Sequence, residues 1–496
     1  MNTQIYNYDA VIIGGGTAGV AAAYALKDSG KRILLVESRE RLGGTAVLAY
    51  VFDWIAGVFP EYLGEVFTCL KQKGKAKGDL EHSWLPCCFR KDGYNDALGN
   101  SIQMVPFDLS EKYCVDLENT GNNTVLDIWL NHCFMDIECW DKGTGTVSQI
   151  KVRDKSGFDK IVSASYFIDS SADAVLCRAK ESVKGIDYFI GRDRKSLYNE
   201  SIAVDNPDPN QLNEPALFYQ LADNADDTAI LNEVKTVKYD AATKKVIKPD
   251  YITWDGYTFA FIDNGEGKAY WCNPMMALGI SGIDVINRGS DAIYEEAETR
   301  ILEHWKYAKL SLKLAHDNGA DDNSKWGINW YVWQRNLSYN YRAPMPGIRE
   351  SYRAACEYML TQNDLARMYT AVENAVAIGT HPVDMHNGKS LDNNEMTRFN
   401  SRDLRPYGIP YQCLLPKRFS NVLAACRAFG ASQIAASSAR TNKLVAQLGW
   451  AAGNAVKYCM DNGGRLKDLS GKELQDEKYI NYQYYTGHIK DILKDF

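Results

Sequence analysis

Two closely spaced histidines, His381 and His386, are the side chains best suited to proton transfer in a chain that holds 7 histidines. They lie in the stretch IGTHPVDMHNG together with Asp384. Because imidazole titrates near neutral pH, this group could act as an acid, a base or a substrate contact. A solvent-facing or structural role is the alternative. A metal site is not expected, because the pair occurs in a proline-containing segment with one carboxylate and not on a helix that would gather the ligands.

A glycine-rich segment near the N-terminus has the pattern of a dinucleotide-binding turn. Residues 8–13 (YDAVII) predict a buried parallel strand, and GGGTAG at 14–19 follows at once. The next residues predict a helix that Gly30 can end and a second strand that finishes at Glu37. An acid at that position accepts hydrogen bonds from ribose hydroxyls, whereas an arginine would suggest a 2′-phosphate. The whole unit matches a βαβ dinucleotide motif.

Each part of this turn has a physical role in holding a pyrophosphate. Gly14 allows the tight turn, Gly16 lets the backbone approach the phosphates, and Gly19 lets the helix pack closely on the strand. Thr17 and Ala18 stand at the helix N-terminus, whose N–H groups and positive dipole end face the phosphates. A glycine-rich turn without a ligand is the alternative, but the strand, turn, helix and acid together favour a dinucleotide.

A second pair of glycines follows the ribose-binding acid, in RERLGGT at 39–45. Here the sequence resembles FAD-dependent oxidoreductases of the two-dinucleotide-binding-domain flavoprotein group, in which such a pair runs beside the pyrophosphate and ribityl chain of FAD. The resemblance implies bound FAD in preference to NAD. The contacts that it implies are Ser38, Arg39, Gly43, Gly44 and Thr45. No histidine follows the glycine pair, so the flavin is expected to be non-covalent.

Two further segments resemble FAD-contacting parts of the same group. FIDSSADAVLCRAKE at 167–181 is similar to the third FAD segment, where a strand ends in small residues, and it implies a contact at Ser170. Residues 123–140 predict one strand, with Cys133 in the stretch where relatives bring main chain to the adenine. Alternating runs between residues 149 and 167 fit a small β-meander.

The block at 421–456 resembles the closing FAD segment of this group along its whole length. It predicts a short buried strand, a loop of small residues and a helix that begins about Thr441–Asn442, where either side chain can cap it. The positive end of that helix would stabilise negative charge at N1 and O2 of reduced flavin. Gln433 stands where a histidine is common in the group, which puts a proton-transfer role there in doubt. The implied cofactor contacts are Arg440, Thr441, Asn442 and Lys443.

Between residues 186 and 415 the FAD segments end and aromatic residues become frequent. No second glycine-rich dinucleotide motif follows a strand there, so an inserted substrate-binding or cap domain is expected. PGIRESYRAACEYMLTQNDL at 346–365 resembles the GxRES segment of the same family, and Arg349 could project into the flavin cavity. An ion pair that fixes two domains is the alternative for Arg349. A helix predicted from Asp291 carries Trp305, which is expected in the core.

The predicted fold class is α/β, with a Rossmann-like FAD-binding domain built on a parallel sheet and a β-meander, and an inserted α+β substrate domain. The FAD-binding domain is discontinuous and comprises residues 1–185 and 416–465, with the inserted domain at 186–415. Residues 466–496 are expected to form a C-terminal tail that packs on the FAD domain.

Composition narrows the class of protein. The formal charge, 56 − 63 = −7, excludes the generally basic surface that nucleic acids require. The chain has 12 cysteines and no C-x-x-C motif, which indicates reduced cysteines, as in a cytosolic protein. Cys87 and Cys88 are interpreted as neighbouring thiols, because a disulfide between adjacent cysteines is strained. The N-terminus has no signal-peptide pattern, and no apolar run approaches the ~20 residues of a membrane span. A cytoplasmic protein is expected.

These features predict an FAD-dependent oxidoreductase that transfers a hydride between flavin N5 and a polar small molecule, with a preference for a sugar or sugar derivative. The candidates for the acid or base are His381, His386 and Arg349, in that order. Fumarate-reductase-like reduction of an activated C=C bond is the alternative, and a non-catalytic scaffold stabilised by FAD is a second one. The external electron acceptor or donor and the oligomeric state have no signature in the sequence.

Overall fold

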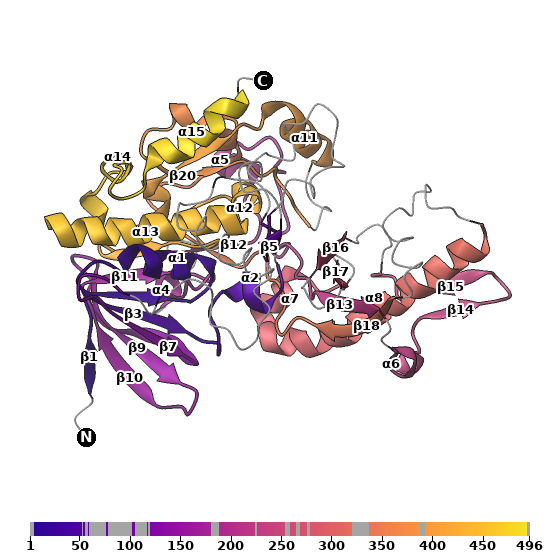
Figure 1. Ribbon diagram of the computed structural model, residues 1–496. Helices are drawn as coiled ribbons and strands as arrows, with labels where there is room; N and C mark the ends of the chain where they lie inside the picture. Colours follow the sequence, from indigo (N-terminus) through magenta and orange to yellow (C-terminus); the bar gives the residue numbers. More distant parts are fainter. Residues whose placement is uncertain are drawn as a thin grey trace. The chain divides into compact units, whose positions relative to one another are not determined.

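The computed structural model of the chain divides into two compact units, which Figure 1 colours by sequence. It describes residues 4–51, 53–54, 58, 76–77, 102–104, 117, 120–179, 188–223, 226–252, 258–263, 268–274, 278–319, 337–386 and 392–493, so the Cys87–Cys88 pair lies outside the described residues. Unit 1 comprises residues 1–47, 52–210 and 351–496, and unit 2 comprises residues 48–51 and 211–350. Residues 351–415 thus belong to unit 1, whereas the sequence pattern groups them with the inserted domain. The substrate-binding role of the insertion stays a prediction.

A parallel sheet forms the centre of unit 1. Its described strands, in order across the sheet, are β22 (Val422–Ala424), β11 (Tyr166–Asp169), β2 (Ala10–Ile13), β3 (Arg32–Glu37) and β7 (Val125–Leu130). The inner strands are runs of buried aliphatic residues, as a parallel sheet covered on both faces requires. This arrangement confirms the predicted α/β fold with a Rossmann-like parallel sheet.

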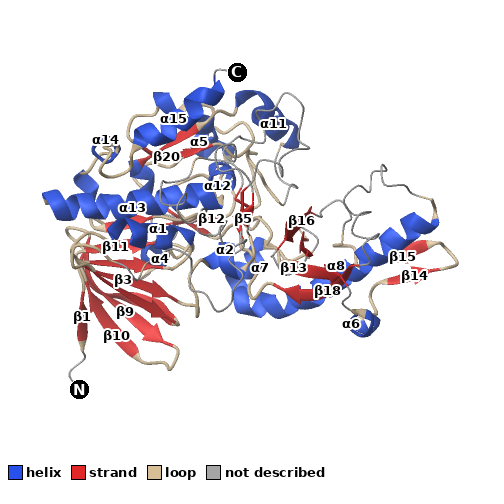
Figure 2. Cartoon of the chain, in the orientation of Figure 1, coloured by secondary structure: helices blue, strands red, loops and turns tan. Residues whose placement is uncertain are grey.

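Unit 1 has three layers, because successive residues of a strand point to opposite faces. Ala10 and Ile12 of β2 share a core cluster with helices α1 (Thr17–Leu26) and α13 (Asn442–Asn462). Val11 and Ile13 share a second cluster with a mixed sheet on the other face. That sheet is the predicted β-meander with one added strand (Figure 2), and its order is β1 (Ile5–Asn7), β10 (Asp159–Ser163), β9 (Thr146–Asp154) and β8 (His132–Asp141).

Two local predictions are wrong. The single strand predicted over residues 123–140 is two strands, β7 in the parallel sheet and β8 in the mixed sheet. Asn131 lies between them with a φ of 57°, in the left-handed region that asparagine tolerates, and this turn separates the sheets. The predicted loop of small residues after β22 contains a helix, α12 (Gln433–Ala439). Ser432 caps it by accepting a hydrogen bond from the N–H of Ala435, 3.1 Å away.

The remainder of unit 1 consists of further, mostly short elements, of which β20 (Ala375–Gly379) and α14 (Gly471–Leu474) pack against α13. The C-terminal segment after α13 contributes Leu474 and Tyr485 to the same core cluster as α1 and α13. The described elements are β4 (Asp53–Trp54), β5 (Ala76–Lys77), β6 (Ile102–Met104), α4 (Val175–Arg178), β12 (Tyr188–Ile190), α5 (Lys195–Tyr198), β19 (Tyr352–Ala354), α10 (Gln362–Leu365), β20 (Ala375–Gly379), α11 (Asn393–Arg398), β21 (Tyr407–Pro410), α14 (Gly471–Leu474) and α15 (Tyr482–Leu493).

Unit 2 is an antiparallel sheet with one long helix. Its strand order is β16 (Thr258–Asp263), β17 (Lys268–Asn273), β13 (Tyr219–Asp223) and β18 (Leu337–Arg342). The helix is α8 (Ser290–Asp317), which begins near Asp291 as predicted. Its Trp305 is 1% exposed and donates from Nε1 to Asp227 at 2.6 Å, so the prediction that Trp305 is a core residue is confirmed. The smaller elements are α6 (Thr228–Glu233), β14 (Lys238–Asp240), β15 (Lys245–Ile247) and α7 (Gly282–Arg288).

A search of the described helices for a membrane span finds none with the necessary length and apolar character. The longest of them, α8 and α13, belong to the two units as packed helices with polar faces. Charged side chains such as Lys309 and Lys313 interrupt α8, and Lys457 interrupts α13. Both helices therefore follow the amphipathic pattern of a globular protein.

Helices α1 and α13 approach closely because small residues meet at their contact. A Cβ atom added to Gly449 would lie 2.0 Å from the carbonyl oxygen of Ala18, and one added to Gly453 would lie 2.6 Å from that of Ala22. The facing pairs advance in the same sense along both helices, so the helices run parallel. The contact therefore fixes how far the N-terminus of α13 extends past that of α1.

This contact predicts that Gly449→Ala destabilises unit 1. The added methyl group meets backbone and not a movable side chain, so we expect a loss of roughly 1–3 kcal/mol or more, typical of overpacking. The thermal midpoint, followed by circular dichroism, should fall by several degrees. Gly487→Ala in α15 is the matched control, because no atom lies within 4 Å of its added Cβ. Equal midpoints for the two variants would contradict the prediction.

Candidate functional site

The first glycine turn contains one glycine that the protein's own packing does not require. A Cβ on Gly14 would lie 2.5 Å from the carbonyl oxygen of Ser170, and one on Gly19 would lie 1.8 Å from that of Gly14. These two glycines are needed by the backbones around them. Among the described residues, by contrast, a Cβ on Gly16 would meet nothing nearer than the Cα of Gly44 at 4.0 Å. Open space therefore lies against Gly16, at the N-cap of α1, where a pyrophosphate is expected.

Glu37 connects this turn to the segment that follows the second strand. Its Oε2 accepts from the N–H of Gly15 at 2.7 Å, and its Oε1 accepts from the N–H of Arg39 at 2.7 Å and the hydroxyl of Ser38 at 3.0 Å. The residue is 7% exposed. A carboxylate offers about four lone-pair positions, so Oε2 retains the capacity to accept one ribose hydroxyl.

The second glycine pair lies directly against the first turn. The N–H of Gly43 donates to the carbonyl oxygen of Gly15 at 2.7 Å, and Gly43 forms a parallel bridge with Gly16. Gly44 and Thr45 begin a short helix, α2 (Gly44–Leu48). The structure thus brings both glycine segments together from opposite ends of the first βαβ unit.

The turn predicted to face the adenine joins the same region. The N–H of Asn131 donates to the carbonyl oxygen of Arg39 at 2.9 Å, which fastens the β7–β8 turn to the residues after Glu37. Cys133, near the start of β8, is exposed. Ser170 is buried, and its N–H donates to Ile13 at 2.8 Å, so the end of β11 is held beside the first turn.

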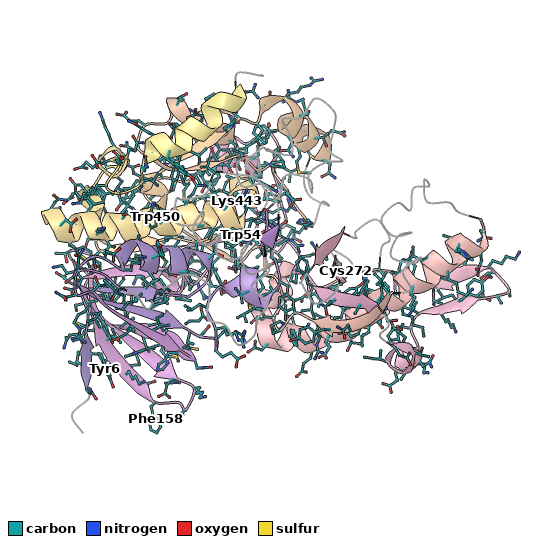
Figure 3. The ribbon with its side chains drawn as sticks, viewed as in Figure 1. Tyr6, Trp54, Phe158, Cys272, Lys443 and Trp450 are labelled. Atoms are coloured by element: carbon teal, nitrogen blue, oxygen red, sulfur yellow. The ribbon has the colours of Figure 1, made fainter. Side chains whose placement is uncertain are left out.

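The N-terminus of α13 lies ahead of that of α1, in the same direction. The contact of Ala18 with Gly449 sets Thr17 opposite Leu448, and Asn442 precedes Leu448 by six residues, which is about 9 Å of helix. Thr441 is the N-cap residue and, within the described residues, its side chain makes no capping hydrogen bond. Lys443, labelled in Figure 3, is in the first turn of the helix. Its side chain is buried. The predicted helix start is confirmed, but the predicted side-chain cap is not formed.

These features fit FAD. Two positive helix ends face the same way and are offset by about 9 Å along the helix axes, which suits a pyrophosphate at α1 and a flavin ring at α13 with a ribityl chain between them. The open space against Gly16 and the remaining acceptor of Glu37 suit the diphosphate and the ribose. The individual cofactor contacts stay predictions.

A cluster of charged and titratable side chains lies where α12 ends. Oδ2 of Asp384 is 2.9 Å from Nε2 of His386 and 2.9 Å from Nη2 of Arg440, the residue that follows α12. Burial favours a raised pKa for Asp384, but the hydrogen bond with His386 and the charge of Arg440 hold that pKa well below its usual range. Asp384 is therefore a carboxylate at neutral pH and connects the histidine segment to the α12–α13 junction.

His381 belongs to the same neighbourhood. Its carbonyl oxygen accepts from the hydroxyl of Ser438, on α12, at 2.5 Å. Its Nδ1 lies 2.8 Å from the carbonyl oxygen of Pro382, an acceptor, so Nδ1 carries the hydrogen and Nε2 carries the lone pair. Burial lowers the pKa of His381, which is 7% exposed, and the ring is neutral at pH 7. A neutral imidazole with an Nε2 lone pair is a base.

Arg349, the third candidate, lies in unit 2. Its Nη1 donates to the carbonyl oxygen of Glu214 at 2.6 Å. The adjacent Glu350 is 5% exposed and accepts from both nitrogens of Asn213, at 2.8 and 2.7 Å. The described bonds of Arg349 and Glu350 are within that unit, and a role for Arg349 in proton transfer stays a prediction. Among the described residues, no cluster of three or more His, Cys, Asp and Glu side chains could hold a metal ion.

Sequence reasoning missed a set of buried charges next to α12. Arg353 is 1% exposed, and its Nη1 is 2.9 Å from Oδ2 of Asp193, which also accepts from the N–H of Gln433 at 2.7 Å. Glu200, also 1% exposed, accepts from the hydroxyl of Ser432 at 2.5 Å. Arg353 lies inside the stretch that resembles the GxRES segment. This resemblance is the feature of the sequence that could have pointed to the buried charges. Asp193 and Glu200 carry no motif.

Comparison with known proteins identifies the family of this chain. A family model described as FAD dependent oxidoreductase matches residues 9–477. This chain belongs to the FAD-dependent oxidoreductase family. Membership confirms the predicted family, the assignment as an oxidoreductase, and FAD as the cofactor that the family implies.

Individual relatives of this FAD-dependent oxidoreductase match over short stretches. The FAD-dependent oxidoreductase dbaF of Emericella nidulans is 59% identical over 46 residues, which are 9% of this chain and 10% of that protein. The (S)-6-hydroxynicotine oxidase of Paenarthrobacter nicotinovorans is 54% identical over 39 residues, 8% of this chain and 9% of that protein. The chain thus spans about a tenth of the length of these curated relatives.

A solved structure gives a longer but weaker match. It is that of a geranylgeranyl bacteriochlorophyll reductase-like protein from Thermoplasma acidophilum, with a TM-score of 0.40 and 12% identity. The match covers 99% of this chain and 85% of the other.

The open space at Gly16 predicts that Gly16→Ala separates FAD binding from folding. Among the described residues the added methyl group meets no atom nearer than 4.0 Å, so the thermal midpoint of the apoprotein should be unchanged. The Kd for FAD, measured by flavin fluorescence, should rise about tenfold or more. Gly15→Ala is the contrasting variant, because its Cβ would lie 2.4 Å from Leu42 and 3.1 Å from the Cβ of Glu37. It should lower the midpoint as well. An unchanged Kd in Gly16→Ala would rule out a pyrophosphate at this position.

The ion pairs of Asp384 predict a pH-dependent stability difference. Because its folded-state pKa lies below the unfolded-state value of about 3.9, the carboxylate stabilises the fold above that pH and loses this effect as pH falls through the folded-state pKa. Asp384→Asn should therefore lower the thermal midpoint at pH 7, and the gap to wild type should close below about pH 4. Asp403→Asn, at a side chain 43% exposed, is the control and should show little gap at any pH.

Proposed function

We propose that this FAD-dependent oxidoreductase transfers a hydride between a polar small molecule and N5 of the flavin, with His381 as the base or acid for the accompanying proton. The observation that carries the proposal is the position of His381. Its main chain is bonded to α12, and α12 is followed by α13, the helix whose N-terminus suits the flavin ring. Its Nε2 lone pair and neutral state match what proton removal requires.

In the oxidative direction the reacting carbon loses a hydride and its hydroxyl or amine loses a proton, so that a C=O or C=N bond forms. Bound FAD would supply the N5 atom that takes the hydride. His381 Nε2 takes the proton. Nδ1 keeps its hydrogen bond with the carbonyl of Pro382 throughout, and this bond holds the ring in one orientation. The reverse direction uses the same groups, with protonated His381 as the acid.

A network of charged and polar side chains lies next to His381. It consists of Asp384, His386 and Arg440. His386 donates from Nε2 to the Asp384 carboxylate, because a carboxylate can only accept. Arg440 donates to the same oxygen, so its positive charge is partly neutralised and its position is fixed. The pair keeps a guanidinium near the N-terminus of α13, where negative charge at the pyrimidine end of a reduced flavin would be stabilised.

The substrate class is proposed to be a hydroxylated small molecule, with a sugar or sugar derivative preferred. The frequent aromatic and polar residues of 186–415 support this preference, because aromatic faces stack on sugar rings. Reduction of an activated C=C bond is the competing chemistry, and Arg440 would then be its candidate proton donor. The family match favours an enzyme over the non-catalytic scaffold.

The proposal is tested by mixing the anaerobic holoenzyme with sugars, polyols, hydroxy acids and amines and following the flavin absorbance. Bleaching by a hydroxylated class would support the proposed direction and name the substrate type. Retained colour, with dithionite-reduced enzyme reoxidised by an unsaturated acid, would replace the proposal with C=C reduction.

His381→Ala should retain FAD and lower the rate of flavin reduction by roughly 10²–10⁴-fold, the usual contribution of a general base. Because burial lowers the pKa of His381 from its ordinary value of 6.5, the rate of flavin reduction in wild type should fall only at pH values below 6.5, where the ring gains a proton. Stopped-flow absorbance measures both effects. His316→Ala, at a side chain 53% exposed in unit 2, is the matched control. A rate in His381→Ala equal to that of the control would remove His381 from the mechanism.

A further inference from the structure

A small cavity lies beside the N-terminus of α12, within unit 1. Its polar lining comes from Arg192, Asp193, Glu200 and Gln433, and its apolar lining includes Ala203 and Ile434. The cavity has room for about one water-sized group. Arg192 is 6% exposed and Gln433 is 2% exposed, so the polar groups are held out of bulk solvent.

Glu200 has one satisfied and one unsatisfied carboxyl oxygen. Its Oε1 accepts from the N–H of Gln362 at 2.7 Å and from the hydroxyl of Ser432 at 2.5 Å. Its Oε2 is buried and has no hydrogen-bond partner among the described residues. A buried acceptor of this kind lacks a donor that a ligand or a proton can supply. Glu200 also lines the cavity, so a group held there lies beside the residue that lacks a donor.

The charge of Glu200 is finely balanced. Burial raises the pKa of Glu200 to about 7, against the hydrogen bonds from Ser432 and Gln362; the charge of Asp193 raises it further and that of Arg353 lowers it. The Arg192 guanidinium and the Asp193 carboxyl group also line the cavity. Asp193 already accepts hydrogen bonds from Arg353 and from the N–H of Gln433. Near neutral pH the carboxyl group is therefore poised between its two forms, and a donor at Oε2 would favour the carboxylate.

The lining selects the chemistry of the occupant. The group must donate to Oε2 of Glu200 and accept from Arg192, whose guanidinium has only donors. A carboxylate has no hydrogen to donate, and an ammonium has no lone pair to accept. A hydroxyl group has both, and its single oxygen matches the size of the cavity. Gln433 can donate or accept and so completes either orientation of the hydroxyl.

The cavity lies on the same side of α12 as Arg440. Gln433 and Arg440 are seven residues apart, which places them on one face of the helix, about 10 Å from each other along the axis. Ala436, between them on that face, is 9% exposed and is the most exposed residue of α12. A hydroxylated chain of several carbons has the length to extend from the cavity to the Asp384–Arg440 pair.

We propose that this cavity is a subsite for one substrate hydroxyl, which donates to Oε2 of Glu200 and accepts from Arg192. The inference rests on the proposed function and sharpens it: the substrate is a polyol or sugar with a hydroxyl several carbons from the carbon that reacts. Water has the same donor and acceptor pattern, and the test separates the two sources.

The binding arm follows the carboxyl infrared band of Glu200 in the holoenzyme, isolated as the difference between wild type and Glu200→Gln. That variant preserves the acceptor atom for Ser432 and Gln362 and replaces only Oε2. Ethylene glycol should lower the apparent pKa of Glu200, read from the pH dependence of this band, by one unit if the carboxylate form binds the glycol tenfold more tightly. 1,2-Dimethoxyethane has no O–H group and should leave that pKa unchanged. Ala203→Val, which fills the cavity, should abolish the shift. An unchanged pKa, or a shift that persists in Ala203→Val, would mean that the cavity holds water only and would overturn the proposal.

The kinetic arm uses a polyol that bleaches the wild-type flavin. Glu200→Gln should raise its KM at least tenfold, whereas Glu357→Gln, at a side chain 33% exposed, should leave the KM unchanged. Bleaching that neither Glu200→Gln nor Ala203→Val affects would overturn the subsite and leave the proposed function intact. A glycol-dependent pKa shift without bleaching by any polyol would support the subsite and contradict the proposed function.

Discussion

The site depends on the close contact between the backbones of α1 and α13. Two glycines of α13, Gly449 and Gly453, meet the carbonyl groups of Ala18 and Ala22, and no side chain fits between them. Because this contact sets the register of two parallel helices, it also sets where each helix begins. The N-terminus of α13 is thereby held about 9 Å ahead of that of α1. A dinucleotide that extends from one positive helix end to the other needs that offset, and it needs it to be rigid.

The position of α12 follows from the same contact. Only Arg440 and Thr441 separate α12 from α13, so a fixed α13 leaves α12 little freedom. Side-chain hydrogen bonds then hold both ends of α12: Ser432 donates to Glu200 at its start, and Ser438 donates to the carbonyl of His381 near its end. Because α13 fixes the position of α12, it also fixes the residues bonded to α12: His381, proposed for proton transfer, and Glu200, proposed for hydroxyl binding.

What the sequence predicts well is local. The βαβ unit, its glycines and the start of α13 each depend on residues within about 30 positions of one another. Their short-range sequence patterns are therefore sufficient to predict them. The break at Asn131 was missed because a left-handed asparagine leaves no mark in a hydrophobic pattern. Helix α12 was missed because its alanines and serines have no apolar periodicity. Glu200 was out of reach, since its partners Gln362 and Ser432 are 162 and 232 residues away.

The two carboxyl groups near α12 show how partners decide charge. Asp384 faces a guanidinium and an imidazole, and these cationic or strongly donating groups hold its pKa low enough that it stays ionised. Glu200 is bonded through one oxygen to an amide and a hydroxyl, which are neutral donors and do not offset its burial, and its pKa rises to about 7. A permanently charged carboxylate, Asp384, therefore lies near one end of α12, and a titrating carboxyl group, Glu200, lies near the other. A permanent charge suits the fixed orientation of Arg440, whereas a titrating carboxyl responds to whichever donor enters the cavity beside it.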